Sequence, residues 1–114
     1  MLAATQAQPN CKEPQTQTDM NVCSAQAARV ADAAMSQHYG QLAGRLKQMD
    51  REQPGYFAAL LASQRAWLRY RDEQCRLEGY RTRGGTAEPM NVSGCLEQLS
   101  VSRTRELKSL MEAF

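Results

Sequence analysis

The chain has 114 residues, which is enough for one domain with one hydrophobic core and too few for two cores of ordinary size. Hydrophobic residues make up 42% and charged residues 23%, a composition typical of a globular protein rather than a disordered one. The net charge of +2 is too small to indicate a polyanionic partner, so we expect no nucleic acid ligand. No stretch has the roughly 18 apolar residues of a membrane span, so no transmembrane span is expected.

The first fifteen residues are a polar stretch without hydrophobic periodicity. We expect residues 1–15 to be a flexible segment that follows a removed signal peptide, and residues 16–114 to form a single helical domain. Residues 2–8 (LAATQAQ) resemble the small-residue end of such a peptide. The sequence therefore predicts a periplasmic or secreted bacterial protein, and a lipid anchor on an upstream cysteine is compatible with it.

The four cysteines lie far apart, at Cys11, Cys23, Cys75 and Cys95. Their even number, the absence of a Cys-x-x-Cys pair and the single histidine argue against a zinc site or a redox motif and predict two disulfides. Disulfides persist in oxidising compartments, which agrees with a periplasmic or secreted location.

Three helical segments account for nearly all of the hydrophobic periodicity. Thr16 and Asp19 resemble a capping box at the start of the first, and Pro54-Gly55 marks its end. Steps of three and four predict that one face of this helix carries Met20, Cys23, Ala27, Val30, Ala34, His38, Leu42, Leu46 and Met49.

The second stripe consists of Phe57, Leu60, Leu61, Gln64, Trp67, Leu68, Arg71 and Cys75. Gly79 follows it and suits a left-handed C-terminal cap. A third helix is predicted to begin near Ser93 and to bury Leu96, Leu99, Arg103, Leu107, Leu110 and Phe114. The predicted fold class is all-α, a small three-helix bundle.

Sequential antiparallel packing brings the start of the first helix, the end of the second and the start of the third together, so the two disulfides are expected to cluster at one end. All three pairings of four cysteines remain compatible with this arrangement. We prefer Cys11 with Cys23 and Cys75 with Cys95, because the second bridge then ties the second helix to the third.

Several of these residues carry a resemblance to a known family. Residues 16–23 (TQTDMNVC), Ala31-Asp32, Tyr39, residues 64–75 (QRAWLRYRDEQC), Gly84-Gly85 and Cys95-Leu96 resemble the LprI-type lysozyme inhibitors. This bacterial envelope family was long classed as a domain of unknown function, and the similarity extends over residues 11–110. It implies an all-helical secreted or lipid-anchored module and a protein partner, a lysozyme or another peptidoglycan hydrolase.

Arg71 lies on the inner stripe of the second helix and needs a polar partner, because an unpaired buried guanidinium is costly. Asn21, Asp32 or a helix-end carbonyl can serve as that partner. We assign Asn21, Asp32, Arg71 and Asp72 to a structural polar network.

The segment at residues 79–91 is long for a connection between bundle helices and is the best candidate for a target-binding loop. Its candidate contact residues are Tyr80, Arg81, Arg83, Gly84 and Gly85. Tyr80 offers an amphipathic ring, and the two arginines can reach carboxylates such as the catalytic pair of a muramidase. The alternative is a solvated, mobile connector.

No motif predicts catalysis. The chain has no His-Glu-x-x-His, no Gly-x-Ser-x-Gly and no phosphate-binding glycine loop, and the adjacent Asp72 and Glu73 point to different sides of a helix. We therefore expect no enzymatic activity, no cofactor and no metal.

Two other classes of function remain open beside hydrolase inhibition. One is a structural or adaptor module of the bacterial envelope that binds no hydrolase. The other is a weakly cationic binder of anionic glycan or nucleic acid, because residues 65–83 contain six arginines against three carboxylates. We rank that possibility last, since an excess of three charges is small for a polyanion-binding surface.

Overall fold

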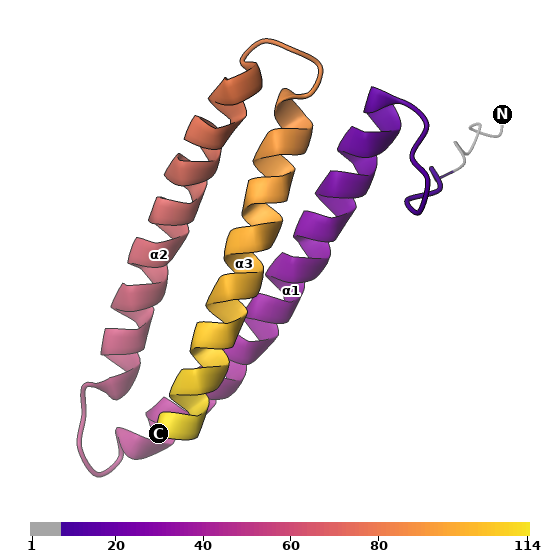
Figure 1. Ribbon diagram of the computed structural model, residues 1–114. Coiled ribbons are helices and arrows are strands. Elements are labelled where there is room, and N and C mark those ends of the chain that lie inside the picture. The colour runs from indigo at the N-terminus through magenta and orange to yellow at the C-terminus, as the bar shows by residue number, and fades with distance from the viewer. Residues whose placement is uncertain (1–7) are drawn as a thin grey trace, which may run out of the picture.

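Figure 1 presents a computed structural model, which describes residues 8–114. The chain forms helix α1 (Gln17–Met49), helix α2 (Tyr56–Gly79), the short 3-10 turn η1 (Tyr80–Thr82) and helix α3 (Glu88–Ala113). Successive helices run in opposite directions, and α3 packs along α1 and α2, which meet each other much less. The predicted three-helix bundle is therefore confirmed, with an elongated shape of 56 × 36 × 27 Å.

The first two helices are connected by a tight turn that Asp50 organises. Its carboxylate accepts hydrogen bonds from the backbone N–H of Tyr56 at 2.8 Å and of Phe57 at 3.2 Å, which satisfies amide groups in the first turn of α2. Gly55 has φ +122°, a conformation that side-chain-bearing residues rarely adopt. At the other end of α1 the predicted cap is confirmed, because Thr16 Oγ1 accepts from the Asp19 N–H at 3.0 Å.

The apolar core lies in the half of the bundle that contains the α1–α2 turn. Its buried members are Met35, Leu42, Ala43, Leu46, Leu60 and Leu107, and aromatic side chains such as Tyr39, Phe57 and Trp67 pack around them. The long aliphatic residues of all three helices thus meet at this end. The opposite half relies on small residues, polar contacts and disulfides.

The predicted inner face of α1 is wrong at Val30 and Ala34, in the middle of the helix. Val30 is 71% exposed and Ala34 is exposed, whereas Ala28, Ala31 and Met35 are buried. The buried face thus lies one position later than predicted. Alanine is only weakly hydrophobic, so in this alanine-rich stretch the prediction of the buried face depended on the single valine, which faces solvent.

The end of α2 and the start of α3 also differ from expectation. α3 begins at Glu88 rather than near Ser93. Pro89 occupies its first turn, where backbone N–H groups have no partner within the helix, so the missing N–H of proline removes no hydrogen bond. Gly79 has φ −62°, so it is no left-handed cap. A Cβ at Gly79 would come within 2.5 Å of Val92 Cγ2, so the close approach of the two helices explains the glycine.

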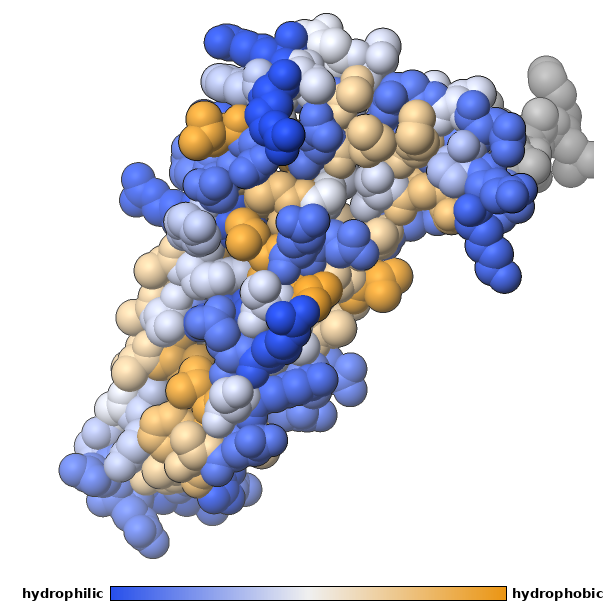
Figure 2. Space-filling view, in the orientation of Figure 1, coloured by the Kyte–Doolittle hydropathy of each residue, from blue (hydrophilic) through white to orange (hydrophobic). Residues whose placement is uncertain are grey.

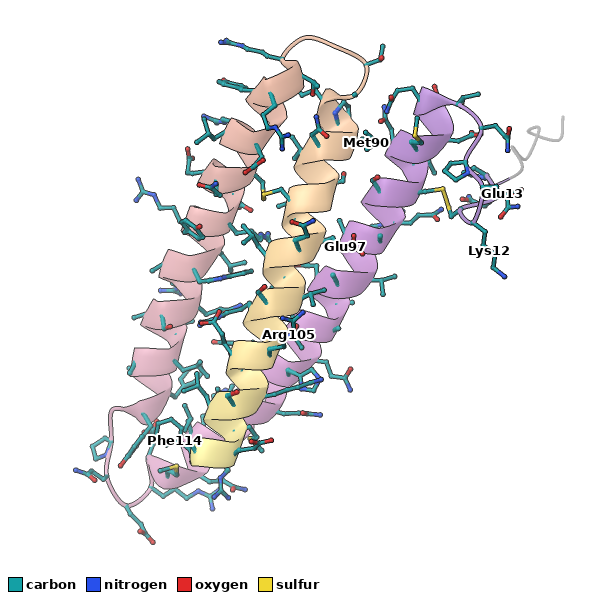
Figure 3. All side chains as sticks on the ribbon, in the orientation of Figure 1. Lys12, Glu13, Met90, Glu97, Arg105 and Phe114 are labelled. Atoms are coloured by element: carbon teal, nitrogen blue, oxygen red, sulfur yellow. A yellow bond between two sulfur atoms is a disulfide. The ribbon has the colours of Figure 1, made fainter. Side chains whose placement is uncertain are left out.

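The preferred disulfide pairing is confirmed. Cys11 is bonded to Cys23 and Cys75 to Cys95, with Cα–Cα distances of 5.5 and 5.4 Å, and no cysteine is free. Figure 3 shows both bridges in the half of the bundle that contains the start of α1. The Cys75–Cys95 bridge joins two helices, whereas Cys11–Cys23 ties only the preceding segment to α1.

The N-terminal part of the sequence is described only in part. Residues 1–7, which include nearly all of the expected signal-peptide remnant, lie outside the described residues. The segment from residue 8 to Thr16 is held to α1 by the Cys11–Cys23 bridge. The flexibility expected for residues 1–15 stays a prediction. Between residues 8 and 114, no helix has both the length and the hydropathy needed to cross a membrane.

The two bridges should contribute unequally to stability. Replacing Cys75 and Cys95 together by alanine removes a cross-link across 20 residues and should lower stability by about 3 kcal/mol, with a melting temperature lower by more than about 10 °C. Replacing Cys11 and Cys23 should have a much smaller effect, because the segment before α1 then stays free in the folded state as well as the unfolded one. Thermal unfolding by circular dichroism measures both, and equal shifts would contradict this assignment.

Candidate protein-binding surface

Arg71 joins all three helices near the middle of the bundle. Its guanidinium donates to Asp32 of α1 at 2.8 Å, to the neighbouring Asp72 at 3.0 Å and to Ser100 Oγ of α3 at 3.3 Å. The Arg71 side chain is 15% exposed, while the two carboxylates are half-exposed or more. The network assigned to Arg71 thus contains Asp32 and Asp72, with Ser100 as a member that the sequence did not indicate.

A second arginine, Arg103 of α3, is more deeply buried and connects to α2. It donates to Gln64 Oε1 and to Ser63 Oγ, each at 3.0 Å. The remaining guanidinium nitrogen, Nη1, lies 3.8 Å from Glu106 Oε2. Both arginines contact Trp67, with guanidinium carbons 5.6 and 5.7 Å from the ring centre. Cation–π attraction and hydrogen bonding therefore act together here. We call Arg71, Trp67 and Arg103, with their polar partners, the arginine clamp.

Asn21 does not belong to this network, which corrects the sequence assignment. Its side chain accepts from Gln17 Nε2 at 2.8 Å and donates to the carbonyl oxygen of Thr86 at 2.9 Å. Asn21 therefore ties the start of α1 to the segment that connects α2 with α3. An asparagine and a backbone carbonyl 65 residues apart carry no sequence signal that would identify the pair.

The α2–α3 connection is shorter than the predicted residues 79–91, and several hydrogen bonds tie it to the helices. Gly84 has φ +78°, and the Gly85 N–H donates to Thr82 O at 2.9 Å. Asn91 Nδ2 donates to Thr82 Oγ1 at 2.7 Å and so anchors the 3-10 turn to α3. With Asn21 on one side and the Cys75–Cys95 bridge at its base, this connection is held from all three helices. We call residues 80–87 the α2–α3 turn.

The side chains predicted to contact a target lie on the outside of this turn. Tyr80 is 46% exposed, and the Arg83 guanidinium stacks on its ring at 4.4 Å. Arg81 forms an exposed ion pair with Glu78 at 3.4 Å. Arg83 forms no ion pair with any residue in the described part of the chain. Figure 2 shows hydrophilic side chains over this end of the molecule.

The arginine-rich stretch at residues 65–83 does not form one cationic surface. Arg71 points inward to its carboxylates, and Arg76 and Arg81 have glutamates at 4.0 and 3.4 Å. Within residues 8–114 there is also no group of three or more side chains suited to hold a metal ion. The positive charge of this stretch is therefore partly neutralised within the chain.

A family model described as lysozyme inhibitor LprI matches residues 8–107. The chain belongs to the LprI family. An uncharacterized protein of Rhizobium meliloti (strain 1021), R02472, is 43% identical over 117 residues, which cover 96% of this chain and 84% of that protein. The crystal structure of a DUF1311 family protein from Pseudomonas putida KT2440 superposes with a TM-score of 0.73 at 24% identity, covering 89% of this chain and 96% of that one. The latter likeness concerns the fold alone.

The LprI-type run at residues 64–75 is explained mainly by the arginine clamp and a disulfide. Gln64, Trp67, Arg71 and Cys75 all face inward in this LprI protein. Tyr70, from the same run, is 55% exposed and has no packing role of that kind. The sequence motif alone does not distinguish Tyr70, on the surface, from its inward-facing neighbours.

The arginine clamp yields a ranked stability prediction for two substitutions. Arg103→Ala should lower the free energy of unfolding by about 3 kcal/mol, because it leaves the buried Gln64 amide unpaired and removes packing against Trp67. Arg71→Ala should lower it by only about 1 to 2 kcal/mol, because Asp32 and Asp72 are exposed enough to be hydrated. Urea unfolding followed by the fluorescence of Trp67 measures both values, and the reverse order would contradict this description.

Proposed function

We propose that this protein is a secreted or periplasmic, non-enzymatic inhibitor that binds a lysozyme or a related peptidoglycan hydrolase. The observation that carries the proposal is the match of residues 8–107 to the family described as lysozyme inhibitor LprI. Two formed disulfides support an oxidising, extracytoplasmic location. No catalytic or metal-binding role is needed for such a protein, because inhibition requires only that a surface block the enzyme's cleft.

We propose the α2–α3 turn as that surface. It projects from one end of an elongated bundle, and its backbone is fixed by hydrogen bonds to Thr82 and by the Asn21 contact. A segment that is already ordered loses little conformational entropy when it docks. This order supports a binding role over the alternative of a solvated connector.

Arg83 is the side chain best placed to reach the acidic groups of a muramidase. Arg81 already has Glu78 as a partner, so its charge is partly neutralised within the chain. Arg83 is held over the Tyr80 ring, which orients the guanidinium without neutralising it. We propose that Arg83 pairs with a carboxylate of the catalytic cleft while Tyr80 packs against its rim.

The double change Arg81→Ala and Arg83→Ala should therefore weaken inhibition by about thirtyfold, since truncating a charge pair desolvated at an interface costs about 2 kcal/mol or more. Arg83→Ala alone should account for most of that loss. Helicity and melting temperature should stay nearly unchanged, because both side chains are exposed. The measurement is the inhibition constant against lysozymes of several classes in a peptidoglycan lysis assay.

The matched control is the double change Arg65→Ala and Arg69→Ala on the exposed side of α2, which removes the same charge. It should leave inhibition intact at moderate salt. Equal losses in both double variants would mean that net charge rather than the turn determines binding. If the native protein inhibits a hydrolase and the turn variant inhibits it equally well, the α2–α3 turn is not the inhibitory surface. If the native protein inhibits no hydrolase, the structural or adaptor function is favoured.

A further inference from the structure

A polar groove lies beside the α2–α3 turn, and the proposed inhibitory contact does not account for it. Its volume is about 520 Å³. One face of α3 forms its floor and one face of α2 forms a wall, while Ser24 of α1 borders the far side. The lining is Ser24, Tyr70, Gln74, Glu78, Arg81, Met90, Asn91, Gly94, Cys95, Gln98 and Leu99. Figure 3 labels Met90 at the start of α3, beside α1.

Several polar side chains in this groove have no partner within the described chain. The hydrogen bonds among residues 8–114 include none from the side chains of Tyr70, Gln74 or Gln98. Amides offer both donors and an acceptor, and a tyrosine offers a hydroxyl and a flat apolar ring. The groove therefore presents unused hydrogen-bonding groups next to an exposed aromatic surface.

The charge and the shape of the groove limit the chemical classes of ligand that it can bind. Glu78 and Arg81 at the rim pair with each other at 3.4 Å, so the groove favours a neutral ligand over a phosphate or a carboxylate. A helix-in-groove partner needs an apolar groove, and an added strand needs a free sheet edge, which this helical bundle does not offer. A ligand rich in hydroxyl and amide groups with flat C–H faces fits the lining best.

We infer that this groove binds a neutral oligosaccharide of N-acetylated amino sugars. The amide side chains of Gln74 and Gln98 pair with hydroxyl and acetamido groups, and the Tyr70 ring stacks on a sugar face. Met90 and Leu99 provide the apolar contact that an acetamido methyl group requires. This goes beyond the proposed inhibition, because it gives the protein a glycan ligand of its own.

The glycine at position 94 leaves the groove open at one point of its lining. It lies within α3 on the groove floor, where a glycine destabilises a helix, and a Cβ there would meet no atom within 4 Å. Packing therefore does not require glycine at this position. Its missing side chain keeps the floor low and the groove open.

The test is a titration of the oxidised protein with the trisaccharide of N-acetylglucosamine, followed by NMR of the backbone amides. We expect saturating shifts confined to the groove residues of α2 and α3. Cellotriose, which has hydroxyls in place of the acetamido groups, should bind about tenfold more weakly. Absence of shifts at millimolar trisaccharide, shifts elsewhere on the bundle, or equal binding of cellotriose would each overturn the proposal. No hydrolase is present, so the result is independent of inhibition.

Variants separate a binding role from a structural one. Tyr70→Ala and Gln98→Ala should each weaken trisaccharide binding by about tenfold without changing the melting temperature. The matched controls Leu77→Ala and Gln37→Ala, both at exposed positions outside the groove, should bind as the native protein does. The assignment would be overturned if the groove variants bound the trisaccharide as tightly as the native protein does, or if the control variants lost as much affinity as the groove variants.

In the variant Gly94→Leu, a loss of trisaccharide binding could not be explained by a loss of stability. Leucine favours the helix, so the melting temperature should stay the same or rise, while the side chain fills the groove and abolishes binding. Gly44→Leu is the control, because Gly44 is also within a helix and has open space at its Cβ. Native affinity in Gly94→Leu would exclude the groove as the binding site.

Discussion

The position of α2 depends on the arginine clamp. Most of the packing in the bundle is between α3 and its two neighbours, and α1 meets α2 at few places. Arg71 crosses from α2 to Asp32 of α1, and Arg103 crosses from α3 to Gln64 of α2. Both guanidinium carbons also lie within 5.7 Å of the centre of the Trp67 ring. Without these contacts, few interactions would fix α2 against α1.

In the half of the bundle that contains the α2–α3 turn, α2 and α3 are held together by close approach and one disulfide instead of large apolar side chains. Cys75 is almost completely buried in its bridge to Cys95, and Gly79 lets α2 approach Val92 of α3. These contacts fix the direction in which the chain leaves α2. The α2–α3 turn therefore has a defined position relative to the bundle axis, and Asn21 holds it from α1. The same contacts place the polar groove directly beside the turn.

The sequence was sufficient to predict the elements that leave strong local signals. Thr16 correctly marked the start of α1, and Pro54-Gly55 indicated the α1–α2 turn, although α1 itself ends earlier, at Met49. The stripe of α2 contained large apolar residues at regular spacing. The clustering of the four cysteines at one end followed from the antiparallel order of the helices, whereas their pairing was a preference among three possibilities that the structure confirms. These features depend on local chemistry or on topology that any short-looped bundle shares.

Other features depend on tertiary contacts that leave little trace in the sequence. The buried phase of α1 was missed because Ala28 and Ala31 contribute little hydrophobic contrast. Asn21 contacts a carbonyl of the α2–α3 turn, which no residue type predicts. The groove is formed by residues of three helices, so its composition becomes visible only when those helices are side by side.

The most direct measurement is amide hydrogen exchange of the protein alone and in the presence of lysozymes of several classes. The account predicts added protection in the α2–α3 turn and in the adjoining first turns of α1 and α3, with the α1–α2 turn at the other end unchanged. Protection confined to the α1–α2 turn or to the outer face of α1, or the absence of a complex with any lysozyme, would contradict it.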